Sequence, residues 1–144
     1  MYKNKIEQLL DRCLKSKKTL TPSRIQIFKT LAKYSKPQSA YDLKDAVNKK
    51  RDTSLNISTI YRVLDFWIKL GAIHKISSIN KYIVCLKPNE KHTHMLNYCT
   101  RCEKVFESCT KEMNLDFKAS AAKLDLVFNN TKTIEIPVIC PSCN

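Results

Sequence analysis

The sequence predicts an α+β fold in two parts, an N-terminal winged helix-turn-helix module and a small α/β domain with a four-cysteine zinc site. Three observations predict it. Apolar residues recur at helical spacing up to Gly71, the only glycine, and directly after it the spacing changes to two, as in strands. The formal net charge is +13, from 26 basic and 13 acidic side chains. Four of the seven cysteines form two C-x-x-C pairs in the second half.

Length and composition narrow the class of protein. A chain of 144 residues holds one ordinary domain or two small ones. No run of about eighteen apolar residues is present, so we expect no membrane span. The first seven residues lack the apolar core of a secretion signal, and we therefore expect a cytoplasmic protein. In that compartment cysteines indicate metal or redox chemistry more than disulfides.

The first half is predicted to form four helices. Thr21-Pro22 predicts the start of the second helix, because threonine caps helices and proline at the first position loses no hydrogen bond. Residues 39–42 (SAYD) resemble a capping box that opens the third. The helical repeats are Ile6, Leu9, Leu10, Cys13 and Leu14; Ile25, Phe28, Leu31 and Ala32; Leu43, Ala46 and Val47; and Ile57, Ile60, Leu64, Trp67 and Ile68.

A two-stranded hairpin is predicted after the fourth helix. Gly71 suits the left-handed position that ends a helix, and residues 73–76 and 81–85 then read as strands around a polar turn. Helices followed by a hairpin is the order of a winged-helix module, in which one helix enters the DNA major groove. A helical domain with an incidental hairpin is the alternative. The positive charge favours a polyanionic partner, although solubility alone would also explain it.

The polar, proline-containing segment 87–91 is the predicted hinge, which gives a DNA-binding domain at 1–86 and a second domain at 92–144. In the second domain, residues 95–98, 105–107 and 133–136 read as strands. Leu115, Ala119, Ala122 and Leu124 fit the apolar side of a helix between them. A domain of about fifty residues buries little core alone, so we expect it to need a staple or a partner.

The two C-x-x-C pairs predict a metal site that would cross-link this domain. Cys99, Cys102, Cys140 and Cys143 supply four thiolates, which can close a tetrahedral zinc site with no position left for water. Such a site is structural. The alternatives are redox-active dithiols or buried free cysteines, but neither pair has the strand–C-x-x-C–helix context of a thioredoxin.

A second group of metal-ligating residues is spread along the chain. His74 and Cys85 lie on the predicted hairpin, His92 follows the hinge, and Glu107 follows the first C-x-x-C. Two imidazoles, a thiolate and a carboxylate are a plausible zinc set, and the thiolate disfavours iron or manganese. Each residue also has a plainer reading: a surface histidine, a core cysteine or a solvated strand-edge carboxylate.

Several motifs together resemble the ferric uptake regulator superfamily, and within it the zinc uptake regulator branch. The resemblance covers residues 16–109 and extends to the C-terminus. The motifs are LTPSR at 20–24, SAYDL at 39–43, STIYRVLDF at 58–66, GAIHK at 71–75, YIVC at 82–85, HTH at 92–94, CTRC at 99–102, ESC at 107–109 and CPSC at 140–143.

The resemblance implies a zinc-responsive transcriptional repressor. It implies a homodimer joined through residues after about Pro88, a regulatory zinc on His74, Cys85, His92 and Glu107, and hence two zinc ions per subunit. The zinc-loaded dimer is expected to bind an AT-rich inverted-repeat operator in double-stranded DNA and to repress zinc-uptake genes. We expect no catalytic activity, no membrane and no small organic substrate.

The resemblance also implies which side chains meet DNA. Arg62 is expected to donate two bonds to a guanine edge, Tyr61 and Tyr41 to lie near thymine methyls or phosphates, and Ser58 and Thr59 to face phosphates. The family often has a basic residue at the position of Thr19, to reach a minor groove. Here Lys17 and Lys18 lie just upstream, and either these lysines substitute, with Lys18 the expected one, or the contact is missing. His94 is read as solvated, or as supporting a ligand from the outer shell.

Three alternatives stay open at this point. An iron or peroxide sensor of the same superfamily would favour nitrogen and oxygen ligands over Cys85. A zinc enzyme would use the second group with an exchangeable water, but the sequence has no H-E-x-x-H helix. A structural zinc adaptor would bind DNA regardless of chelators.

Overall fold

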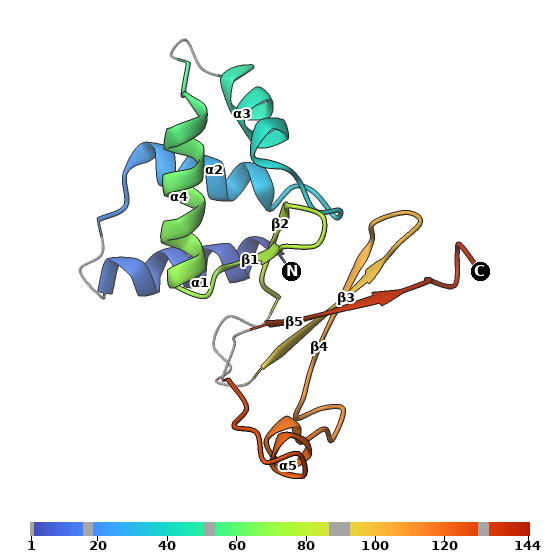
Figure 1. The fold of residues 1–144 in the computed structure, drawn as a ribbon. Coiled ribbons are helices and arrows are strands. Elements are labelled where there is room, and N and C mark those ends of the chain that lie inside the picture. Colours follow the sequence, from blue (N-terminus) through green and yellow to red (C-terminus); the bar gives the residue numbers. More distant parts are fainter. Residues whose placement is uncertain (1, 16–18, 51–53, 87–92, 130–132) are drawn as a thin grey trace. The chain divides into compact units, whose positions relative to one another are not determined.

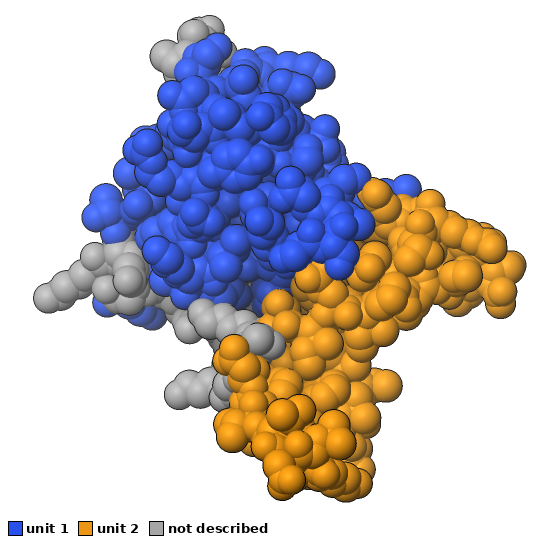
Figure 2. Space-filling model, viewed as in Figure 1, with its two compact units in different colours: residues 1–89 blue, residues 90–144 orange. Residues whose placement is uncertain are grey.

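The computed structural model describes residues 2–15, 19–50, 54–86, 93–129 and 133–144. The chain divides into two compact units, Met1–Asn89 and Glu90–Asn144, which Figure 2 colours separately. The predicted hinge, residues 87–91, lies outside the described residues. No helix among the described residues is long and apolar enough to cross a membrane.

The described residues of unit 1 form four helices followed by a hairpin, in the order predicted (Figure 1). They are α1 (Tyr2–Lys15), α2 (Pro22–Leu31), α3 (Ala40–Asn48), α4 (Ile57–Lys69), β1 (Ile73–Ile76) and β2 (Lys81–Val84). The predicted helix starts are confirmed: Thr21 accepts from the amide of Arg24, and Ser39 and Asp42 form the capping box. Gly71 has φ 73°, the left-handed conformation that ends α4.

The core of unit 1 is built around Trp67 of α4. Its ring lies 4.6 Å from that of Phe28 on α2, between centroids, and its indole Nε1 donates to the carbonyl of Arg24 at 3.0 Å. The Arg24 guanidinium lies 3.9 Å over the ring of Phe66. These contacts fix α4 against α2 and leave the opposite side of α4 to solvent.

The hairpin extends one residue beyond β2. In the β1–β2 ladder His74 pairs with Ile83, and the amide of Cys85 donates to the carbonyl of Ala72 at 2.9 Å. Side chains alternate between faces along each strand, so His74 and Cys85 project from the same face as diagonal neighbours.

Unit 2 is a three-stranded sheet with the order β4-β3-β5. Its elements are β3 (His94–Cys99), β4 (Val105–Cys109), α5 (Phe117–Ala122) and β5 (Thr133–Val138). The pair β3–β4 is antiparallel and the pair β3–β5 is parallel. The three strands predicted in this region are confirmed, each one or more residues longer than its apolar pattern.

The predicted helix in unit 2 is present, but it is shorter than its apolar pattern. α5 is six residues long and buries none of them. Leu115 and Leu124 lie outside the helix, 45% and 72% exposed. The apolar spacing therefore did not indicate packing against this unit's own sheet.

Candidate metal centres and nucleic-acid interface

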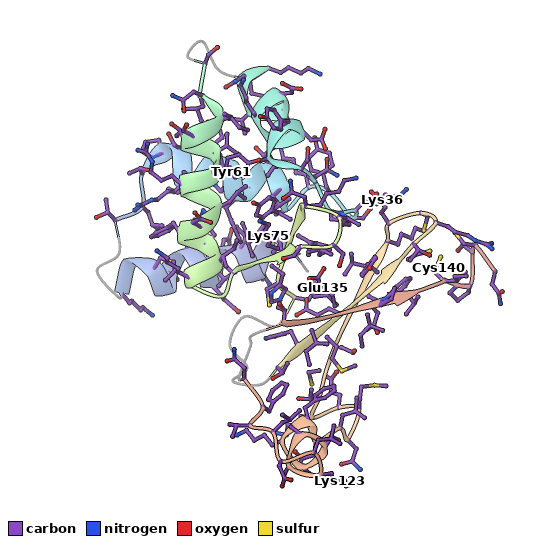
Figure 3. All side chains as sticks on the ribbon, viewed as in Figure 1. Lys36, Tyr61, Lys75, Lys123, Glu135 and Cys140 are labelled. Atoms are coloured by element: carbon purple, nitrogen blue, oxygen red, sulfur yellow. The ribbon has the colours of Figure 1, made fainter. Side chains whose placement is uncertain are left out.

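The four C-x-x-C cysteines meet at one end of the unit 2 sheet. Cys99 ends β3 and Cys140 follows β5, and the parallel β3–β5 pairing carries both to the same end (Figure 3 labels Cys140). The Sγ atoms of Cys99, Cys102, Cys140 and Cys143 all lie within 4.8 Å of one another. The Sγ atoms of Cys102 and Cys140 are 3.6 Å apart. Sulfurs bound tetrahedrally at about 2.3 Å from zinc are about 3.8 Å apart, so this cluster fits zinc.

The electrostatics of the cluster also suit a cation. The backbone amides of Cys140 and Cys102 donate to Cys99 and lower the pKa of its thiol to about 6, against a smaller effect of burial. Hydrogen bonds with the thiols of Cys102 and Cys140 raise the pKa of Cys143 to about 12. The backbone thus favours the thiolate form of Cys99, whereas the neighbouring thiols disfavour a second thiolate at Cys143. A bound cation would stabilise both negative charges.

Two further possible metal ligands lie on the β1–β2 hairpin, which is the wing of unit 1. His74 and Cys85 are 5% and 2% exposed, and a ring nitrogen of His74 lies within 4.8 Å of the Cys85 sulfur. A nitrogen and a sulfur donor on one face can bind one ion together, but they supply only half of a tetrahedral set.

Another two side chains that can bind a metal lie next to each other in the unit 2 sheet. His94 Nδ1 and Glu107 Oε1 are 2.7 Å apart, and the two side chains are 8% and 4% exposed. In the β3–β4 ladder Leu96 is the direct partner of Glu107, so His94 is its diagonal neighbour on the same face. The interpretation of His94 as solvated is wrong, since the strand that carries it turns it into this pair. His92, the predicted fourth ligand, lies outside the described residues.

The solvent side of α4 carries the predicted DNA-contacting residues. Arg62 and Ser58 are exposed, and Tyr61 is half-buried against the core (Figure 3 labels Tyr61). Thr59 already takes part in the cap of α4, because its amide and hydroxyl both donate to Asn56 Oδ1, at 2.9 and 3.0 Å. That cap restricts Thr59 more than the sequence indicated.

Two further predicted DNA residues lie away from α4. Tyr41, in the first turn of α3, is 60% exposed. Lys18 lies outside the described residues. Beside that position, the Arg24 guanidinium donates to the carbonyl of Thr19, which ties the segment before α2 to the helix. No pattern in the sequence indicated this contact.

Comparison with known proteins places the chain in a family. The model of the ferric uptake regulator family matches residues 15–134. The chain belongs to the ferric uptake regulator family, a family of transcription regulators. It is 30% identical over 148 residues to the zinc uptake regulation protein of Escherichia coli (strain K12), covering 99% of this chain and 85% of that protein. The protein of the same name from Shigella flexneri matches equally.

Solved structures agree with this assignment. A zinc uptake regulator complexed with zinc and DNA matches with a TM-score of 0.86 and 28% identity, covering 99% of this chain and 95% of that one. Holo XcZur matches with a TM-score of 0.80 and 27% identity, covering 97% and 96%. The predicted fold class, a winged-helix part followed by a small α/β part with a cysteine cluster, is confirmed.

Proposed function

We propose that the chain is a zinc-responsive, DNA-binding repressor that holds two zinc ions per subunit. The observation that carries this proposal is a histidine–cysteine pair on the wing of a winged-helix unit, next in sequence to the helix that would read DNA. A thiolate in this position favours zinc over ferrous iron. The full-length similarity to zinc uptake regulation proteins supports the same metal.

The structural zinc would be held by Cys99, Cys102, Cys140 and Cys143. Four thiolates leave no position for substrate or water, so this ion would supply folding energy and no catalysis. Because the cysteines come from the ends of β3 and β5, they would keep the edge strand β5 in register with the centre of the sheet.

The regulatory zinc would be held by His74, Cys85, His92 and Glu107. His74 and Cys85 belong to unit 1, whereas Glu107 belongs to unit 2. A metal shifts a conformational equilibrium only as far as it binds one arrangement better than another. Ligands contributed by both units meet that condition, so zinc binding and the spacing of two reading helices would be linked.

The described side chains suit a DNA-facing role. Arg62 on α4 would donate to a guanine edge, and Ser58 and Tyr41 would contact the backbone or thymine methyls. Tyr61 and Thr59 would contribute less, since the first packs partly against the core and the second caps the helix. Lys18 would reach the minor groove. The expected target is an AT-rich inverted repeat near zinc-uptake genes. The protein would act in the cytoplasm.

A second copy of the chain is the proposed partner of unit 2. Its exposed large apolar residues lie mostly between β4 and β5: Met113, Leu115, Leu124, Leu126 and Val127, the last 95% exposed. Monomeric surfaces seldom collect so many. A twofold dimer would cover them and present two copies of α4 to an inverted repeat.

A mobility-shift titration tests the proposal. Zinc, iron and manganese would be titrated into metal-depleted dimer with an operator fragment under strong chelation. Zinc is expected to restore binding at the lowest free concentration, and Cys85→Ser to raise the zinc required while leaving the fold intact. Cys109→Ser, which removes a buried thiol outside both groups, is the control. DNA binding that ignores zinc would refute the proposal.

A further inference from the structure

The His94–Glu107 pair is a buried polar contact among the described residues of unit 2 that the proposed function has not used. Both side chains are under a tenth exposed, and their 2.7 Å separation is that of a strong, charge-assisted hydrogen bond. Glu107 alone is among the proposed ligands. A buried carboxylate would lose much of its solvation, and such a group needs a defined partner.

The direction of the bond follows from its chemistry. An ionised carboxylate only accepts hydrogen bonds, so His94 Nδ1 carries the proton and donates to Glu107 Oε1. The donation fixes one carboxylate oxygen and the rotamer of the side chain. Carboxylates keep capacity for further bonds, so a metal can share the group with the imidazole.

The strand register places this donor beside Glu107. His94 is opposite Cys109 and Glu107 is opposite Leu96, all within one antiparallel ladder. Diagonal neighbours in such a ladder are within reach of long side chains. On the other side, β5 pairs with the same stretch of β3, with Leu96 opposite Glu135, so the central strand is held from both edges.

We infer that His94 is a positioning residue, which orients the Glu107 carboxylate for the regulatory zinc by donating from Nδ1. This inference rests on the proposed function. Outer hydrogen-bond partners of metal ligands typically contribute about 10–100-fold to metal affinity. His94 would thus set the zinc concentration at which the repressor responds, without touching DNA.

Two substitutions separate positioning from direct ligation. In His94→Asn the side-chain amide nitrogen occupies the place of Nδ1, whereas in His94→Gln it lies near the place of Nε2. Zinc affinity of the second site is measured by competition with a chelator of known affinity in dimer whose four-cysteine site is already loaded. The absorption of Co²⁺ added to the same dimer reports the ligand set.

Positioning predicts that His94→Ala and His94→Gln weaken zinc binding about 10–100-fold, that His94→Asn restores it, and that the Co²⁺ spectrum of His94→Asn is unchanged. Equal losses in Asn and Gln variants, with an altered Co²⁺ spectrum, would show His94 as a ligand and overturn the inference. Unchanged affinity in His94→Ala would also overturn it. If the unchanged chain binds no second zinc, or Cys85→Ser has no effect on it, the proposed function fails as well.

Discussion

Removing one thiol from each C-x-x-C pair should unfold unit 2 without unfolding unit 1. The change is the double substitution Cys102→Ser and Cys143→Ser, which leaves Cys99 and Cys140 as the remaining donors. Two thiols cannot close a tetrahedral zinc site. Among the described residues of unit 2, α5 buries none, and two of the few buried side chains are Cys99 and Cys140 themselves.

The size of the loss follows from the loop that zinc closes. Cys102 and Cys140 are 38 residues apart in sequence, and their sulfurs are 3.6 Å apart in space. If a metal cross-link limits the unfolded chain as a disulfide does, closing a loop of this length stabilises the folded unit by about 4 kcal/mol. For a unit of this size that corresponds to a fall in melting temperature of about 16 °C or more.

Two probes distinguish the units. Trp67 is the only tryptophan and lies in the core of unit 1, so its fluorescence follows unit 1 alone. Amide hydrogen exchange in β3 follows unit 2. The variant should lose β3 protection while the Trp67 transition stays in place, and Cys109→Ser should retain both. If β3 protection survives and the melting temperature falls by less than about 4 °C, the cysteines do not form the cross-link.

Three further predictions concern unit 1 and DNA. Arg62→Ala should weaken operator binding by about 1–3 kcal/mol and non-specific binding by less, measured by fluorescence anisotropy on both duplexes; equal losses would place Arg62 on phosphate only. Gly71→Ala should destabilise unit 1 by about 1–2 kcal/mol in urea unfolding followed by Trp67, because alanine resists φ 73°; an unchanged midpoint would contradict the helix-end role. Operator affinity should fall steeply between about 50 and 200 mM salt, and a flat response would argue against phosphate contacts by unit 1.

Local signals predicted unit 1 closely. Thr21, Ser39 and Gly71 each act within a few residues of themselves, through caps and a left-handed turn, so sequence alone locates them. The apolar pattern around α5 predicted a longer helix than the structure has, and helical spacing shows that a face is apolar but not what covers it. Leu124 is 72% exposed, as expected for an apolar residue that a second copy of the chain would cover.

The His94–Glu107 contact lay beyond sequence reasoning for a different reason. Its two residues are thirteen apart, and only the strand register decides whether they share a face. A shift by one residue would turn His94 to the opposite side of the sheet from Glu107. The four cysteines needed no register to be predicted, because two C-x-x-C turns already specify a four-sulfur cluster.

The same geometry recurs on the wing and in the sheet. In each, two ligand-type side chains are diagonal neighbours on one face of an antiparallel ladder: His74 with Cys85, and His94 with Glu107. In the proposed site, however, His74 and Cys85 alone would leave half of a tetrahedral coordination to water, and Glu107, which His94 would orient, supplies a single donor. If the regulatory ion takes donors from both units, as proposed, the ligands of neither unit retain it alone. Zinc affinity would then contain the free energy of bringing the units together, which is what makes the metal a switch and not a permanent part of the fold.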